Sequence, residues 1–178
     1  MSLTIVDFNN FWSPSGGGVR RYHLEKMNFY RYETDAVYVF VMPDSRTYTE
    51  QLTDSLIIEH VKAFKFPGKW EYRMLWKSSQ IAPILKRHKP DIIEVGSPYI
   101  LPTVVRKNAK KIVPRAKLLG FWHADFPITY VERPIAEKFG KKLGKLASQV
   151  AFAYARYEFK GVTGIQVSAE ETRLRLKR

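Results

Sequence analysis

The chain has 178 residues, of which 45% are hydrophobic and 26% charged, and it contains no cysteine. This composition is that of a globular protein with one core, and it excludes a disulfide framework and thiol catalysis. Residues 1–60 hold five Lys/Arg and eight Asp/Glu, whereas residues 61–178 hold 25 and nine, so the net charge of +13 is concentrated in the second part. Such asymmetry favours an anionic partner: nucleic acid, anionic lipid or a phosphorylated substrate.

The first half of the chain alternates between strand and helix patterns. Residues 3–8 predict a strand, and a loop rich in Asn, Ser, Pro and Gly leads from it to Gly16, Gly17 and Gly18. The following elements are a helix at 19–30, a strand at 36–42 that Pro43-Asp44 ends, a strand at 56–60, and a helix at 70–88 that Pro83 kinks or breaks.

The second half continues the alternation. The pattern predicts a strand at 92–95, a helix at 98–111 with Pro102 in its first turn, a strand at 117–122, a helical stretch at 134–160 broken near Gly140 or Gly144, a strand at 164–167, and a helix from 169 onward.

Strands that alternate with helices imply βαβ units and a parallel sheet. We expect one α/β domain over residues 1–178, a Rossmann-like, doubly wound, mainly parallel sheet flanked by helices, with strand order 3-2-1-4-5-6. Ligands of such sheets bind beyond the carboxyl ends of the strands, at the switch point between strands one and four. This places the glycine triplet, residues 94–98 and residues 123–126 along one rim.

Gly16, Gly17 and Gly18 allow a ligand to approach the backbone, and they open a helix whose N–H groups favour an anion or a hydroxyl-rich group. A flexible loop is the alternative interpretation. A dinucleotide site needs G-x-G-x-x-G directly after the first strand, whereas these glycines are contiguous and follow a longer loop. The spacing therefore argues against an NAD- or methyl-donor-dependent Rossmann enzyme. The only feature in favour of such an enzyme is Asp44, just past the second strand.

Three further polar side chains fall on the expected rim. His123 and Asp125 follow the strand at 117–122, where a histidine can bond a sugar hydroxyl or a leaving phosphate and an aspartate can orient a polar group. Glu94 is at the end of the strand at 92–95 and can accept hydrogen bonds from hydroxyls. The other histidines, His23, His60 and His88, have no metal-ligand spacing, so we expect no metal site and interpret them as structural or solvated.

Lysines recur on one face of the predicted helix at 134–160. Lys138, Lys141, Lys142 and Lys145 have the three- and four-residue spacing of a helix face. Such a stripe can lie on an anionic membrane surface, each charge adding about 1 kcal/mol, and a solvated helix face is the alternative. A separate hypothesis is a non-catalytic module for nucleic acid, in which Trp70, Tyr72 and Trp76, interleaved with basic residues, stack on bases.

Four segments together resemble family-four retaining glycosyltransferases of the GT-B fold. They are V-D-F at 6–8 with F-W-S-P-S-G-G-G-V-R-R-Y at 11–22, K-P-D-I-I-E-V-G-S-P-Y at 89–99, F-W-H-A-D-F-P at 121–127, and V-S-A-E at 167–170. The resemblance spans nearly the whole chain and implies transfer of a sugar, with retention, from a nucleotide-sugar donor that serves as substrate, without a cofactor or metal.

The resemblance also implies roles for individual residues. Gly16, Gly17 and Gly18 would lie against the donor phosphates and the acceptor, His123 would contact the donor sugar as the catalytic residue, and Glu94 and Asp125 would line the acceptor side. The acceptors of many relatives are lipid-linked or anionic, which suits the lysine stripe. The relatives have a second, C-terminal Rossmann domain that binds most of the nucleotide, so we expect this chain to be the N-terminal half and to be inactive without that domain in the same or a partner chain.

The sequence also predicts where in the cell the protein is located. No apolar run is long enough to cross a bilayer, and residues 3–8 are too short for the apolar region of a signal peptide. Together with the absence of cysteine, this predicts a cytoplasmic protein, peripheral at the inner face of the membrane if the lysine stripe binds lipid.

Overall fold

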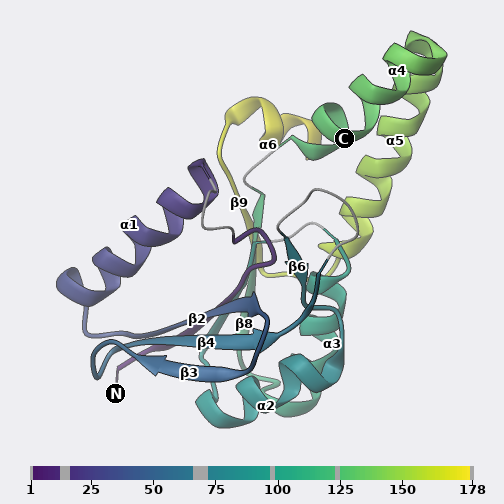
Figure 1. Ribbon diagram of the computed structural model, residues 1–178. Helices are drawn as coiled ribbons and strands as arrows, with labels where there is room; N and C mark the ends of the chain where they lie inside the picture. Colours follow the sequence, from purple (N-terminus) through teal and green to yellow (C-terminus); the bar gives the residue numbers. More distant parts are fainter. Residues whose placement is uncertain (1, 13–16, 66–71, 97–98, 123–124, 177–178) are drawn as a thin grey trace.

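The computed structural model describes residues 2–12, 17–65, 72–96, 99–122 and 125–176. In this part of the chain the centre is a seven-stranded sheet in the order β3-β4-β2-β1-β7-β8-β9 (Figure 1). All neighbouring strands are parallel except β3 and β4. The strands are β1 (Thr4–Phe8), β2 (Val37–Asp44), β3 (Tyr48–Gln51), β4 (Leu56–Lys62), β7 (Ile92–Val95), β8 (Lys117–Trp122) and β9 (Gly164–Val167).

The parallel strands confirm the predicted topology. In chain order they are β1, β2, β4, β7, β8 and β9, and across the sheet they follow the order 3-2-1-4-5-6. The switch point lies between β1 and β7, which pair from Ile5 with Ile92 to Phe8 with Val95. The α/β fold class with a mainly parallel sheet is therefore as the sequence predicts. Its ligand crevice is expected beyond Phe8 and Val95.

Two apolar cores lie on opposite faces of the sheet. On β1, Val6 and Phe8 belong to one core and Ile5 to the other, as the alternation of side chains along a strand requires. Residues 38–41 of β2 are fully buried and alternate between the same two cores. Burial on both faces explains why the sequences of these strands are nearly continuous runs of apolar residues.

Helices cover both faces of the sheet (Figure 1). α1 (Gly18–Glu33) packs against β2 and β4, and its Met27 belongs to the core that contains Ile5. α2 (Ser78–His88) and α3 (Leu101–Ile112) pack against each other and contribute to the core on the other face. Pro102 is in the first turn of α3, as predicted.

The chain after β8 forms a helical arm, residues 127–158, which extends away from the sheet (Figure 1). It comprises the π-helix η1 (Pro127–Glu132), α4 (Arg133–Phe139) and α5 (Lys141–Glu158), which pack against one another. The predicted break falls at Gly140, whose φ of +93° suits glycine. β9 and α6 (Glu170–Leu176) follow the arm. Among the described residues, no helix combines the length and the hydropathy that crossing a membrane requires.

The helix predicted at 70–88 is wrong in extent. α2 begins only at Ser78, because residues 73–74 form β6 (Arg73–Met74), which pairs with β5 (Phe64–Lys65) in a small separate hairpin. The side-chain oxygen of Gln80 accepts hydrogen bonds from the backbone N–H groups of Trp76 and Lys77, each at 3.0 Å, and so fixes the start of the helix. α2 then continues through Pro83 without a break.

The end of β2 also differs from the prediction. The strand continues through Pro43 and Asp44, which pair with Val61 and Lys62 of β4. Proline lacks a backbone N–H donor but keeps its carbonyl acceptor. Pro43 and the residues beside it can therefore still form the other hydrogen bonds of the parallel ladder. The edge strand β3 was not predicted, since all four of its side chains are exposed and carry no apolar alternation.

Candidate functional site

α1 begins at the carboxyl edge of the sheet, at the end of the glycine loop. Gly17 precedes the helix, Gly18 is its first residue, and both are exposed. Among the described residues, no atom lies within 4 Å of a Cβ atom built on either glycine. Within the described part of the chain, the first turn of α1 has neither an acidic residue nor a side-chain cap. The described residues therefore leave the start of α1 open to a ligand, and its backbone N–H groups favour an anion.

Asn9 lies at the switch point itself, directly after β1. Its backbone N–H donates to the carbonyl of Val41 at 3.1 Å, and its side-chain oxygen accepts a hydrogen bond from the N–H of Phe11 at 2.8 Å. A Cβ atom on Gly96, beyond the end of β7, would lie 3.6 Å from the Asn9 amide. Asn9 thus fills the space where β1, β2 and β7 end, and it fixes the first turn of the loop toward α1.

The next residue anchors the loop to the small hairpin. Asn10 is buried and binds the backbone of Leu75 in both directions: its amide donates to the Leu75 carbonyl at 3.2 Å, and its oxygen accepts from the Leu75 N–H at 2.8 Å. The loop is consequently held at its origin by backbone contacts to β2 and to the segment after β6.

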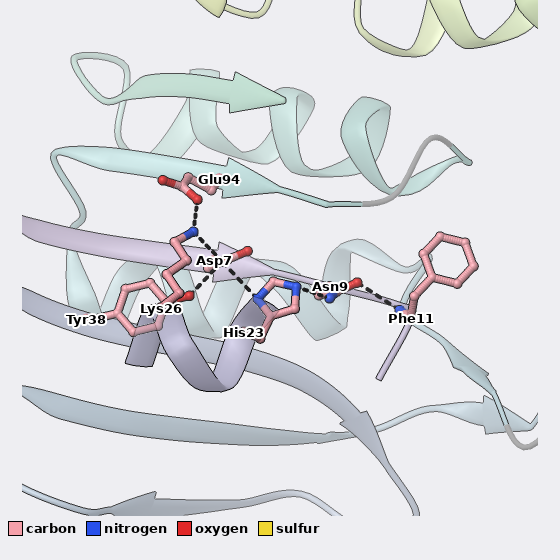
Figure 2. A network of polar contacts seen from close by, with 7 residues as sticks. All are labelled: Asp7, Asn9, Phe11, His23, Lys26, Tyr38 and Glu94. Atoms are coloured by element: carbon pink, nitrogen blue, oxygen red, sulfur yellow. Dashed lines mark hydrogen bonds and ion pairs between the residues drawn. The ribbon is translucent and has the colours of Figure 1, made fainter. Parts of the chain in front are cut away.

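A buried polar network lies beneath α1, between the helix and the sheet (Figure 2). Asp7 is 1% exposed and accepts hydrogen bonds from Lys26 Nζ at 2.7 Å and from the Tyr38 hydroxyl at 2.6 Å. Lys26 also pairs with Glu94. His23 and Lys26 are three residues apart on α1, and Asp7 and Glu94 are register partners on β1 and β7. Four elements that meet at the switch point therefore share one network.

Lys26 is central to the electrostatics of the network, because it faces both carboxylates. Burial raises the pKa of Asp7, but Lys26 and His23 outweigh this effect and hold it well below its usual value. Burial lowers the pKa of Lys26, yet Asp7 and Glu94 together raise it above its usual value. For Glu94, burial and then the charge of Asp7 raise the pKa, against the effect of Lys26. Asp7 is thus held as a carboxylate and Lys26 as an ammonium.

His23 links this network to the rim (Figure 2). The imidazole is fully buried, with Nδ1 3.5 Å from the Asp7 carboxylate and Nε2 hydrogen-bonded to the Asn9 amide. A proton on Nδ1 faces Asp7 favourably and leaves Nε2 free to accept from Asn9, whose oxygen then accepts from Phe11. Asp7, His23 and Asn9 form a chain of contacts that orients the Asn9 amide at the switch point.

Asp125 lies on the rim beyond β8 and is tied to α6. Its carboxylate forms an ion pair with Arg175, which also pairs with Glu171. Burial raises the pKa of Asp125 above its usual value, and the Arg175 guanidinium opposes this shift. The pairing fixes the segment after β8 against the helix that follows β9.

A surface pocket of about 400 Å³ lies at the other end of the sheet. Residues 89–91, which precede β7, and residues 113–116, which precede β8, line it. Ligands of parallel α/β sheets bind beyond the carboxyl ends of the strands, whereas this pocket is at the amino ends. It is therefore not the candidate site.

No protein-family model and no curated protein matches the chain. Among solved structures, the chain is similar to an alpha-glucosyltransferase in complex with UDP and a 13-mer DNA containing a central A:G mismatch. The identity is 13% and the TM-score 0.49, over 95% of this chain and 38% of the other. The chain thus spans well under half the length of that protein.

The structure positions four of the six predicted site residues. Gly17 and Gly18 open α1, Glu94 lies in the buried network with a 15% exposed side chain, and Asp125 pairs with Arg175. The contacts join Glu94 to α1 and Asp125 to α6, so different helices hold the two carboxylates. Gly16 and His123 lie outside the described residues.

The three histidines interpreted as structural or solvated are structural. His23 lies near Asp7, His60 Nδ1 is 2.8 Å from Asp44, and His88 Nε2 is 2.6 Å from Glu59. In the described ranges no group of His, Asp and Glu has the arrangement of a metal site.

The core of the network was not predicted from the sequence. Asp7, His23 and Lys26 were not grouped, although two signals point to them: a carboxylate within an apolar strand, and a histidine and a lysine three residues apart on the next helix. A charge in a buried strand needs a partner, and the helix after it is the nearest element that can supply one. Asn9 had no comparable signal.

Proposed function

We propose that the chain is the acceptor-side domain of a retaining glycosyltransferase that uses a nucleotide-sugar donor. The observation that carries the proposal is the start of α1, the helix that follows β1 at the switch point: Gly17 and Gly18 are exposed there, and among the described residues no atom lies within 4 Å of a Cβ built on either. A helix N-terminus that begins with exposed glycines suits the phosphates of such a donor. The four glycosyltransferase-like segments supply the reaction class.

In the proposed site, the residues predicted from the sequence have distinct roles. Gly16, Gly17 and Gly18 border the donor phosphates, so that the N–H groups at the start of α1 stabilise the negative charge that grows on the leaving diphosphate. His123 contacts the donor sugar. Glu94 and Asp125 line the acceptor side and orient its hydroxyls. The Asp7–His23–Asn9 chain keeps the wall of the site in place.

Catalysis in this proposal needs a second Rossmann domain, in the same or a partner chain. In the resembled family that domain holds most of the nucleotide and supplies further charge stabilisation. The loss of one such donor group typically lowers turnover by roughly 100- to 1000-fold. We therefore expect the chain alone to bind donor or acceptor weakly and to transfer sugar only when the second domain is present.

Calorimetric titration with UDP, GDP and their sugars tests the proposal. Gly18→Leu places a side chain where an added Cβ meets none of the described atoms within 4 Å, so we expect the helix to tolerate it while the approach to the phosphates is obstructed. We expect the variant to lower affinity about tenfold or more, since it blocks the charged contacts at the helix start. Asn28→Leu, at an exposed position of the same helix, is the matched control and should bind as the wild type does.

Two results would contradict the proposal. One is equal binding by the Gly18→Leu and wild-type chains, which would place the ligand elsewhere. The other is a steep loss of single-stranded RNA or DNA affinity with added salt in a chain that binds no sugar nucleotide, which would favour a nucleic-acid module.

A further inference from the structure

We propose that the helical arm docks on an anionic lipid surface through the exposed apolar face of α5, lying along the surface without crossing it. The inference is independent of the proposed glycosyl transfer. It rests on the side chains that α5 leaves uncovered and on the charges beside them.

The exposed face of α5 is a continuous apolar stripe. Leu143, Leu146, Val150, Tyr154 and Tyr157 recur at three- and four-residue spacing, and their exposed fractions range from 38% to 64%. At 100° per residue these five positions fall within an arc of about 80°, along about 21 Å of helix. Large side chains in such a row differ from the scattered apolar residues of an ordinary surface, and they indicate an interaction face.

The packing of the arm explains why the large side chains point outward. The face of α5 that is buried against the rest of the arm and the domain carries Gly144, Ser148 and Ala155. A Cβ atom on Gly144 would lie 2.7 Å from Ala136 Cβ, and the Ser148 hydroxyl donates to Glu132 at 2.6 Å. Small residues thus allow close contact between the helices, and the bulky apolar residues remain on the opposite side.

Basic residues border the stripe on one flank. Lys142 is exposed beside the stripe, about 80° from its centre, and Arg156 and Lys145 are exposed farther round the helix on the same side, at about 120° and 140°. The one acidic residue of α5, Glu158, is buried and accepts a hydrogen bond from the Thr103 N–H. The outer surface of α5 therefore carries positive charge and apolar area without exposed negative charge.

An anionic lipid surface complements both properties. Amphipathic helices of this kind bury an apolar face roughly 5–10 Å into the headgroup region while lysines contact the anionic headgroups. A second copy of the chain would instead bring two basic flanks together, between molecules of net charge +13. Charge complementarity therefore selects lipid rather than self-association.

Labelling at single cysteines tests the inference, because the chain has no cysteine of its own. Val150→Cys and Tyr32→Cys carry a polarity-sensitive dye at exposed positions, 64% in the stripe and 67% on α1. With vesicles of phosphatidylcholine and phosphatidylserine we expect a blue shift for the label at 150 and none for the label at 32. Pure phosphatidylcholine vesicles should give a much smaller shift, and added salt should reduce the binding.

Vesicle sedimentation of unlabelled variants provides the second readout. We expect Leu146→Asp with Val150→Asp to lower the partition coefficient about tenfold or more, and Lys142→Gln with Lys145→Gln to lower it roughly fivefold per charge. Lys86→Gln with Lys110→Gln removes the same net charge from exposed positions outside the arm and should have a smaller effect. Circular dichroism establishes that each variant is folded.

Three outcomes would overturn the inference. Absence of binding to anionic vesicles at low salt is the first. Equal loss of binding in the two lysine pairs, with no effect of the aspartates, would indicate adsorption through overall charge. Concentration-dependent dimers that Val150→Asp dissolves, without vesicle binding, would make the stripe a contact between copies of the chain.

Discussion

At the scale of single residues, the buried network depends most on Lys26. Its ammonium is the cation that Asp7 and Glu94 share, and both carboxylates are largely withdrawn from water. We predict that Lys26→Met lowers the free energy of unfolding by about 3–5 kcal/mol, because it leaves two buried acidic groups without their cation. Urea unfolding measures the change. Arg21→Met, at an exposed position of the same helix, should change stability by about 0.5 kcal/mol or less, and equal effects of the two substitutions would refute the assigned role.

Asp7 makes stability depend on pH. Its pKa in the fold lies below the value of about 3.9 in an unfolded chain, so its stabilisation is present above about pH 3.9 and is lost as the pH falls through the folded pKa. We predict that the difference in unfolding free energy between the wild type and Asp7→Asn shrinks as the pH falls from about 5 toward about 2. Asp54→Asn, at an exposed position, should show no such trend. A difference that stays constant with pH would show that the charge of Asp7 does not stabilise the fold.

At the scale of elements, the arm depends on close packing at Gly144. A Cβ atom there would meet Ala136 Cβ at 2.7 Å and the Glu132 carbonyl oxygen at 2.8 Å. We predict that Gly144→Ala destabilises the arm by about 1–3 kcal/mol, despite the better helix propensity of alanine. Hydrogen exchange should accelerate in α4 and α5 more than in the sheet.

Gly164→Ala provides the control for this change. Its Cβ atom would lie at an ordinary 3.7 Å from Leu119, so its exchange pattern should match that of the wild type. If Gly144→Ala left the arm amides as protected as before, the contact of α5 with α4 and η1 would be looser than the structure indicates.

The elements also show what a sequence can and cannot predict. The six parallel strands were predicted, most of them because buried β-branched and aromatic runs have few other interpretations, whereas the half-exposed β9 was predicted from its place in the alternation of strands and helices. β3, β5 and β6 were not, because they are short and exposed or half-buried, so hydrophobic periodicity gives no signal. The predicted lysine stripe is divided by the break at Gly140, because Lys138 lies on α4 and Lys141, Lys142 and Lys145 lie on α5. The apolar stripe of α5 was not predicted, since a pattern cannot tell which face of a helix is buried when small residues make the tight contact.

Like the fold, the candidate site could be predicted only in part from the sequence. Topology alone places Gly17 and Gly18 at the sheet edge, because the first crossover helix of a parallel sheet must start there. The contacts of Glu94 and Asp125 with Lys26 and Arg175 depend on how distant helices fold back, which no local pattern encodes.

At the scale of the whole molecule, two surfaces have different proposed roles. The rim at the switch point is proposed to bind a nucleotide sugar, and the outer face of the arm to bind anionic lipid. Each surface can be tested without the other, since Gly18→Leu alters only the rim and Val150→Asp only the arm.

Amide chemical-shift mapping of the ¹⁵N-labelled chain with UDP- and GDP-sugars decides whether the start of α1 binds a sugar nucleotide. We predict that saturable shifts concentrate at Gly17, Gly18, Asn9 and Gly96, and that Gly18→Leu abolishes them. Shifts confined to the pocket lined by residues 89–91 and 113–116, or the absence of shifts with every nucleotide sugar, would contradict it.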